Sequence, residues 1–178
     1  MKKIKTPFKG LLVYKGKRYN DKRGFLREVF QKYIIKKNLV FSVTSSSKKN
    51  VLRGLHLQTK KSQDKYITVL KGKILDVVVD LRRKSKTYGK HFKIILDENN
   101  IKFLIIPKGF AHGFQTLEPN CEILYFHTQF YAPHSEGGYR YDSPQLNIPW
   151  PLEVTEVSRK DENLDFFCSM GSQKQNAM

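Results

Sequence analysis

Two histidines of this 178-residue chain lie in segments that favour contact with a ligand. His56 lies in a strand-like segment, 51–58, whose alternation puts Leu52, Gly54, His56 and Gln58 on one face and Arg53, Leu55 and Leu57 on the other. A glycine beside a histidine leaves room for something other than protein to approach. His112 follows one proline and one glycine and precedes another glycine, which predicts an irregular backbone between strands, a common place for site residues.

These histidines could hold a metal ion or move protons. The Pro-x-Gly-x-x-His arrangement of residues 107–112 is similar to the second half of the cupin metal motif. The first half needs a His-x-His pair and a glutamate on one strand, whereas the chain has His56-Leu57-Gln58. Three or four ligands cannot be assembled from these positions, so the sequence predicts no metal, although the cupin fold remains indicated.

Other chemistries have less support in the sequence. There is no Gly-x-Ser-x-Gly motif, and neither Cys121 nor Cys168 has an evident histidine partner. The glycine-rich phosphate loops are missing as well. A phosphorylated ligand would therefore be held by side-chain cations, for which Arg23 and Arg53 are candidates because a guanidinium group binds diphosphates through parallel hydrogen bonds.

Short strands separated by turn residues dominate the predicted elements. Besides the His56 segment, strands are expected at Leu11–Tyr14, Ile74–Leu81, Phe92–Leu96, Ile101–Ile106 and Glu122–Tyr131. Helices are expected only at Phe30–Asn38 and Lys160–Phe167. This pattern favours an all-β jelly roll with a few short peripheral helices. We expect one domain over residues 1–170 and a polar, disordered tail over residues 171–178.

Composition and charge restrict the function classes. Hydrophobic residues make up 39% of the chain and aromatic residues 12%, too much for a disordered protein. No apolar run approaches the ~20 residues of a membrane helix, and no apolar segment follows the basic N-terminus, so we expect a cytoplasmic protein with reduced thiols. The net charge of +17 suits nucleic acid or a small phosphorylated substrate. The lysines are dispersed, however, and no nucleic-acid-binding motif accompanies them.

Several spaced segments together resemble the dTDP-4-dehydrorhamnose 3,5-epimerases. The resemblance runs from about Thr6 to Asp161 and is carried by Asp21–Phe25, Val51–His56, Asp76–Arg82, Ile106–Phe114, Ser135–Gly137 and Trp150-Pro151. It implies a metal-free cupin-type jelly roll, a homodimer, and a nucleoside-diphosphate 4-keto-6-deoxy sugar as substrate. It also implies that no dissociable cofactor takes part.

The resemblance assigns roles to individual residues. The family inverts carbons beside the ketone by removing and replacing a proton, which requires a base, an acid and a group that stabilises the enolate oxygen. His56 matches the base, Asp161 the carboxylate that orients it, and Lys65 the cation near the keto oxygen. His112 and Asp76 match a second polar pair in the pocket. The other expected substrate-binding residues are Arg23, Glu28, Arg53 and Gln58.

The chain also departs from the family pattern at the expected sugar end. The acid tyrosine of the family falls on Phe130, which has no proton to give, so Tyr125, Tyr131 or water would have to supply it. A Gln-x-Asn that contacts the sugar falls on Phe41-Ser42-Val43. We therefore expect that the parts of the site that hold the base and the nucleotide persist, whereas the part that contacts the sugar has changed.

Three hypotheses follow. The first is an epimerase acting at C3, C5 or both in activated deoxysugar biosynthesis. The second is a nucleotide-sugar-binding cupin that performs another keto-sugar isomerisation or no longer epimerises. The third, which rests on charge alone, is a nucleic-acid binder.

Overall fold

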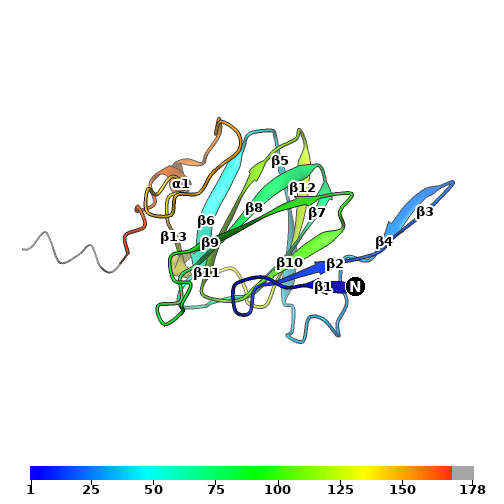
Figure 1. Cartoon of the computed structure of the whole chain (residues 1–178), viewed down its shortest axis with the longest axis horizontal. Coiled ribbons are helices and arrows are strands. Elements are labelled where there is room, and N and C mark those ends of the chain that lie inside the picture. The colour runs from blue at the N-terminus through cyan, green and yellow to red at the C-terminus, as the bar shows by residue number, and fades with distance from the viewer. Residues whose placement is uncertain (170–178) are drawn as a thin grey trace, which may run out of the picture.

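The computed structural model describes residues 1–169 and is built from two packed antiparallel sheets, with a hairpin projecting from one end (Figure 1). The strands are β1 (Lys2–Ile4), β2 (Leu12–Lys15), β3 (Arg18–Asp21), β4 (Gly24–Arg27), β5 (Phe41–Ser47), β6 (Leu52–Gln58), β7 (Lys65–Lys71), β8 (Lys73–Asp80), β9 (His91–Asp97), β10 (Lys102–Ile106), β11 (Phe110–Thr116), β12 (Cys121–His127) and β13 (Glu136–Gly138). A 3₁₀ turn, Pro133–Ser135, and one helix, α1 (Arg159–Glu162), complete the described elements. The predicted all-β jelly-roll class is confirmed.

The larger sheet has the strand order β1-β2-β10-β7-β12-β5, and the smaller has β13-β6-β11-β8-β9. Their facing sides enclose the main core, to which the larger sheet contributes Val13, Ile67 and Ile123 and the smaller contributes Ile74, Val78 and Phe114. Burial of such side chains supplies the driving force that holds the sheets together.

Strand β8 shows why the alternation of residue types along the sequence predicted this architecture. Leu75, Val77 and Val79 pack in a second cluster on the outer side of the smaller sheet, whereas Val78 belongs to the core between the sheets. The two faces of the strand therefore follow the expected alternation. Both faces are buried, the outer one because residues 139–167 cover it, with Leu146 and Phe167 among the buried side chains there.

The helix predicted over Phe30–Asn38 is wrong. This segment contains only a turn, in which the amides of Ile34 and Ile35 both donate to the carbonyl oxygen of Gln31. Ile35, 2% exposed, packs on the outer side of the larger sheet with Tyr66, Phe103 and Ile105. The spacing of the apolar residues reflects their anchoring to this face of the sheet. A helix this short forms too few hydrogen bonds to be stable unless tertiary packing favours the helical conformation, and here the packing favours a turn.

The second predicted helix, Lys160–Phe167, is reduced to the single turn α1. The Ser158 hydroxyl caps its start by accepting from the backbone amide of Asp161, and the chain leaves the helix at Asn163. Phe167 is instead buried against the smaller sheet. The predicted tail, residues 171–178, lies outside the described residues.

Two local predictions around the histidines need correction. Residues 110–116 form the regular strand β11, so His112 lies within a strand, and only the turn before it, at Lys108 and Gly109, is irregular. In β6 the alternation breaks, because the register against β11 shifts between the His112–His56 and Phe114–Arg53 pairs. This irregularity lets Arg53 and His56 face the same cavity.

The predicted strand Glu122–Tyr131 ends earlier, at His127. Beyond it the backbone leaves the sheet, and the amide of Ala132 donates to the side chain of Gln58. The described residues contain no helix with the length and apolarity needed to cross a lipid bilayer.

Candidate active site

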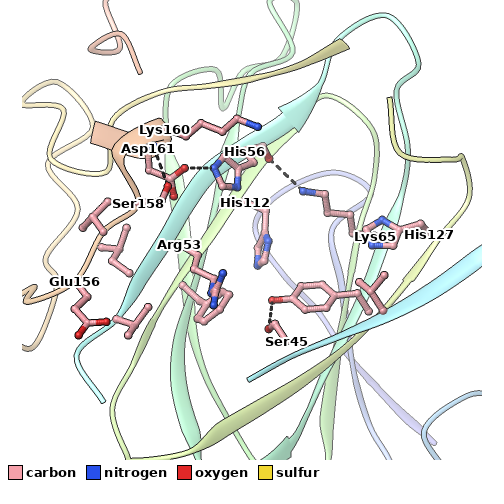
Figure 2. A pocket seen from close by; sticks show the side chains of 16 residues that line it. Ser45, Arg53, His56, Lys65, His112, His127, Glu156, Ser158, Lys160 and Asp161 are labelled. Carbon is pink, nitrogen blue, oxygen red and sulfur yellow. Dashed lines mark hydrogen bonds and ion pairs between the residues drawn. The ribbon is translucent and has the colours of Figure 1, made fainter. Parts of the chain in front are cut away.

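A cavity of about 540 Å³ lies between the two sheets. Strands β6 and β11 form one wall, β5, β7 and β12 form the other, and residues 156–161 form part of the rim. The sandwich therefore brings polar side chains from two sheets to face each other across one space (Figure 2).

His56 and Asp161, which are 105 residues apart in sequence, are in direct contact. His56 Nε2 lies 2.7 Å from Asp161 Oδ1 (Figure 2). The amide of Gly54 donates to Asp161 Oδ2 at 3.0 Å. Burial opposes ionisation of Asp161, but the hydrogen bonds from His56 and Gly54 outweigh it and keep the pKa of the carboxyl below its usual value. The carboxylate fixes the imidazole and leaves Nδ1 of His56 as the nitrogen available to a substrate.

A second imidazole–carboxylate pair lies deeper in the same wall. His112 Nε2 is 2.8 Å from Asp76 Oδ2, and both side chains are buried. Burial lowers the pKa of His112, although Asp76 partly counteracts it. His112 is the cross-strand register partner of His56, so the two pairs form one row across β6 and β11.

Lys65 reaches into the cavity from β7, on the opposite wall, and its Nζ donates to the carbonyl oxygen of His56 at 3.3 Å (Figure 2). Burial lowers the pKa of this amine to about 8, while the carboxylates of Glu136 and Asp76 act in the other direction. The ammonium group is therefore a cation at neutral pH that is only partly shielded by protein and can approach a substrate oxygen.

Tyr125 supplies a phenol on the same wall as Lys65. Its hydroxyl lies 3.5 Å from Ser45 Oγ, and its ring meets the ring of His112 edge-on at 6.4 Å. Burial raises the pKa of Tyr125, so the hydroxyl keeps its proton at neutral pH. A protonated phenol that lines the same cavity as an imidazole base can serve as an acid.

Arg53 lies at the end of β6 nearest the rim. Its guanidinium donates to Ser47 Oγ at 3.1 Å and to the carbonyl oxygen of Ser46 at 3.4 Å. The side chain stays exposed enough to keep donors for another partner. This placement suits recognition of a phosphate group at the cavity mouth.

Five predicted site residues lie outside the lining of this cavity, and one of them, Asp76, is the buried partner of His112 described above. Gln58 is buried and braces the loop after β12, donating to the carbonyl oxygens of Lys61 and Phe130 and accepting from the amide of Ala132. Arg23 lies in the turn of the projecting β3–β4 hairpin, and Glu28 directly follows β4. Both side chains are exposed.

Phe130, the fifth, differs most from its predicted place. It is 62% exposed and stacks on Phe41 at 6.2 Å between ring centroids. The phenol that the structure places in the cavity is Tyr125, whereas the hydroxyl of Tyr131 donates to Glu136 on the protein surface.

Sequence reasoning missed His127, which also lines the cavity. It ends strand β12 and carries no neighbouring glycine or motif that would separate it from an ordinary buried histidine. Its alternation with Tyr125, two residues earlier, is the only local signal that both face the same side. No group of three or more His, Cys, Asp or Glu side chains in residues 1–169 could hold a metal ion.

Comparisons with known proteins identify the family and the fold. The family model for dTDP-4-dehydrorhamnose 3,5-epimerase matches residues 5–168. An enzyme of that name from Methanothermobacter thermautotrophicus is 39% identical over 168 residues, covering 90% of this chain and 91% of its own. One from Salmonella typhimurium is also 39% identical, over 166 residues, covering 89% and 91%.

Solved structures extend the similarity to three dimensions. A Legionella pneumophila dTDP-6-deoxy-D-glucose-3,5-epimerase in complex with dTDP-4-keto-L-rhamnose gives a TM-score of 0.88 at 39% identity, covering 92% of this chain and 91% of that one. A Bacillus anthracis dTDP-4-dehydrorhamnose 3,5-epimerase with TDP and pyrophosphate gives 0.89 at 35% identity, covering 93% and 99%. On sequence and structure alike, this chain belongs to the dTDP-4-dehydrorhamnose 3,5-epimerase family.

Proposed function

We propose that the chain epimerises C3, C5 or both of a nucleoside-diphosphate 4-keto-6-deoxy sugar. The observation that carries this proposal is the His56–Asp161 pair, 2.7 Å apart, facing a cavity whose other wall holds Lys65 and Tyr125. The names of the relatives, and the dTDP-4-keto-L-rhamnose bound in the Legionella structure, support the substrate class. The pathway is activated deoxysugar biosynthesis.

The cavity holds the groups that this reaction requires. His56 Nδ1 removes a proton from a carbon beside the ketone, and the electron pair of the broken C–H bond forms the enolate double bond. Lys65 stabilises the negative charge that develops on the oxygen. Tyr125 then delivers a proton to the opposite face of that carbon, the ketone re-forms, and solvent returns the proton from the His56 imidazolium to the Tyr125 phenolate.

Solvent exchange tests this assignment directly. In deuterated water, the wild-type protein should place deuterium at the inverted ring carbons, as read by NMR. His56→Ala should abolish exchange, because the other imidazole with a carboxylate partner, His112, is buried deeper in the wall. Wild-type rates of incorporation in His56→Ala would overturn the base assignment.

Tyr125→Phe and Tyr131→Phe form a matched pair for the acid. We expect Tyr125→Phe to lose roughly 10²–10⁴ in epimerisation rate while still allowing exchange at the proton that His56 removes. Tyr131→Phe should retain activity, because its hydroxyl contacts Glu136 outside the cavity. Equal activity in the two variants would contradict the role of Tyr125.

We also propose that a second copy completes each site. The β3–β4 hairpin projects away from the sheets and exposes Tyr19, Phe25 and Leu26 by 56%, 51% and 66% (Figure 1). Such apolar exposure on an isolated two-stranded hairpin suits an interface. A homodimer in which this hairpin reaches the partner's cavity would bring Arg23 and Glu28 to the nucleotide end. Both cysteines are free thiols, which supports a cytoplasmic location.

A further inference from the structure

His127 lies beside Lys65 on the wall opposite the base. It is the register partner of Lys65 on β7 and of Phe41 on β5, so the three residues form one row across the larger sheet. Its ring stacks on Phe41, with centroids 4.5 Å apart and planes 9° from parallel. Figure 2 shows His127 next to the Lys65 side chain at the end of the cavity away from Asp161.

The imidazole of His127 has no hydrogen-bond partner within residues 1–169. The residue is 7% exposed, and Nδ1 is fully covered without a partner. Nε2 is also unbonded but keeps access, and the side chain lines the cavity. Because Nδ1 is covered, Nε2 is the only ring nitrogen of His127 that a ligand atom in the cavity can reach, and it has no protein partner that a ligand would have to displace.

The surroundings decide which proton state His127 presents. Burial lowers its pKa to about 4, with further contributions from Lys65 and His112, so the ring is neutral at pH 7. A neutral imidazole has one N–H and one lone pair. Since buried N–H groups without partners are rarer than under-satisfied acceptors, the favoured tautomer keeps the lone pair on covered Nδ1 and the hydrogen on Nε2.

We propose that the Nε2–H of His127 donates a hydrogen bond to the keto oxygen of the substrate, alongside the ammonium group of Lys65, so that two donors hold the enolate oxygen. This inference rests on the proposed epimerase function. It assigns His127 a catalytic contact that the motifs of the sequence do not indicate. A neutral second donor avoids placing two cations side by side, and it increases the stabilisation of the developing charge without an additional proton transfer.

The imidazole is also fixed before the substrate arrives. Stacking on Phe41 and the nearby ring of Tyr125, 6.2 Å away, restricts rotation of the ring. A donor that is already oriented does not have to reorganise during the reaction. Phe41 thus acts through His127 as a positioning residue.

Two substitutions distinguish the effect of losing the Nε2–H donor of His127 from the effect of losing its imidazole ring. His127→Leu removes the N–H, and we expect kcat to fall about 10²–10³-fold, as when one oxyanion-hole donor is lost, with little change in KM. His127→Gln keeps an N–H at a similar reach and should recover to within about tenfold of wild type. His91→Gln is the control, because His91 bonds the carbonyl oxygen of Leu146 outside the cavity and should leave kcat unchanged.

The outcomes distinguish this inference from the function on which it rests. If wild-type protein shows no solvent exchange with any 4-keto sugar, the proposed function fails. If the wild type is active and His127→Leu keeps wild-type kcat, or if Gln recovers no more than Leu, the second donor is refuted.

Nitrogen-15 NMR gives a readout that does not depend on how the variants fold. In the wild-type protein the His127 ring should be neutral at pH 7, carry its hydrogen on Nε2, and shift that proton downfield when a 4-keto sugar nucleotide binds. A ring with its hydrogen on Nδ1, or a charged ring at pH 7, would overturn the proposal.

Discussion

The two carboxylate oxygens of Asp161 bind two different groups. One bonds the imidazole of His56, and the other accepts from the amide of Gly54, so both the ring and the strand that carries it are fixed by one side chain. The charge of Asp161, which also fixes the tautomer of the His56 imidazole, therefore matters more than the volume of the side chain.

Asp161→Asn tests that conclusion. The amide preserves shape, but its NH₂ group must face either the imidazole or the amide of Gly54, both of which need an acceptor. We expect kcat to fall by about 10²–10⁴ while the fold persists, as seen by circular dichroism. A variant with kcat within a few-fold of wild type would contradict the orienting role.

Lys65 predicts an alkaline limit. Burial lowers its pKa to about 8, so the stabilising cation is present below that pH and is lost as the pH rises through it. The kcat of the wild-type enzyme should therefore decline above pH 8. A profile that stays flat to pH 10 would show that the reaction does not use the charged amine.

His127 and His112 predict acid sensitivity of the fold. The pKa of His127 is lowered to about 4, and that of His112 is lowered too, so between pH 6.5 and 4 the unfolded chain binds protons that the native chain does not. Stability should fall as the pH drops through this window. Urea unfolding at pH 7 and 4.5 should show a smaller loss for His127→Gln than for the wild type, and an equal loss would contradict the buried neutral state.

At the scale of elements, the close approach of β6 and β11 positions the His56–Asp161 pair. Gly54 has φ +121°, and a Cβ there would lie 2.6 Å from Gly113 Cα and 2.8 Å from the carbonyl oxygen of His112. The β6 irregularity that brings Arg53 and His56 to one cavity depends on this contact.

Gly54→Ala should therefore destabilise the protein by at least about 2 kcal/mol and move Asp161 away from His56, with loss of activity. Gly137→Ala is the matched control, because its Cβ would meet only Thr59, at 4.0 Å. That variant should change stability by no more than about 0.5 kcal/mol. Chemical denaturation of the two variants gives the comparison.

The same elements show what the sequence could predict. Alternation predicted β8 correctly, because each of its faces packs on an apolar layer. It failed in β6, where a contact with Gly113 on another strand disturbs the register. It failed again at residues 30–38, where apolar side chains anchor a turn to the larger sheet.

The candidate site was predicted only where a motif carried it. His56 was singled out by the glycine beside it, but the roles of His56, Lys65 and Asp161 came from the family resemblance, since no local pattern links residues 105 apart. The family resemblance assigned the acid position to Phe130 and left Tyr125, Tyr131 or water as replacements, and of these side chains only Tyr125 lines the cavity. His127 had no motif, and only the register of three strands brings it beside Lys65.

For the whole molecule, the projecting hairpin separates Arg23 from the cavity of its own chain. Co-expression of Arg23→Ala and His56→Ala chains with different tags tests sharing between copies. In a doubly purified heterodimer, one site would carry both changes and the other neither, so about half the wild-type activity should return. If each hairpin served its own chain, both sites would be damaged and activity would stay low.

The proposed placement of the base on one sheet and of the acid and the enolate-stabilising cation on the other would also limit which sugars can react. Facing sheets pack about 10 Å apart, and side chains from both sides must reach the same carbon. A sugar with a bulky axial substituent would hold the walls apart and impair removal and return of the proton together. Selection by ring thickness is thus a property of the sandwich itself, independent of which nucleotide the sugar carries.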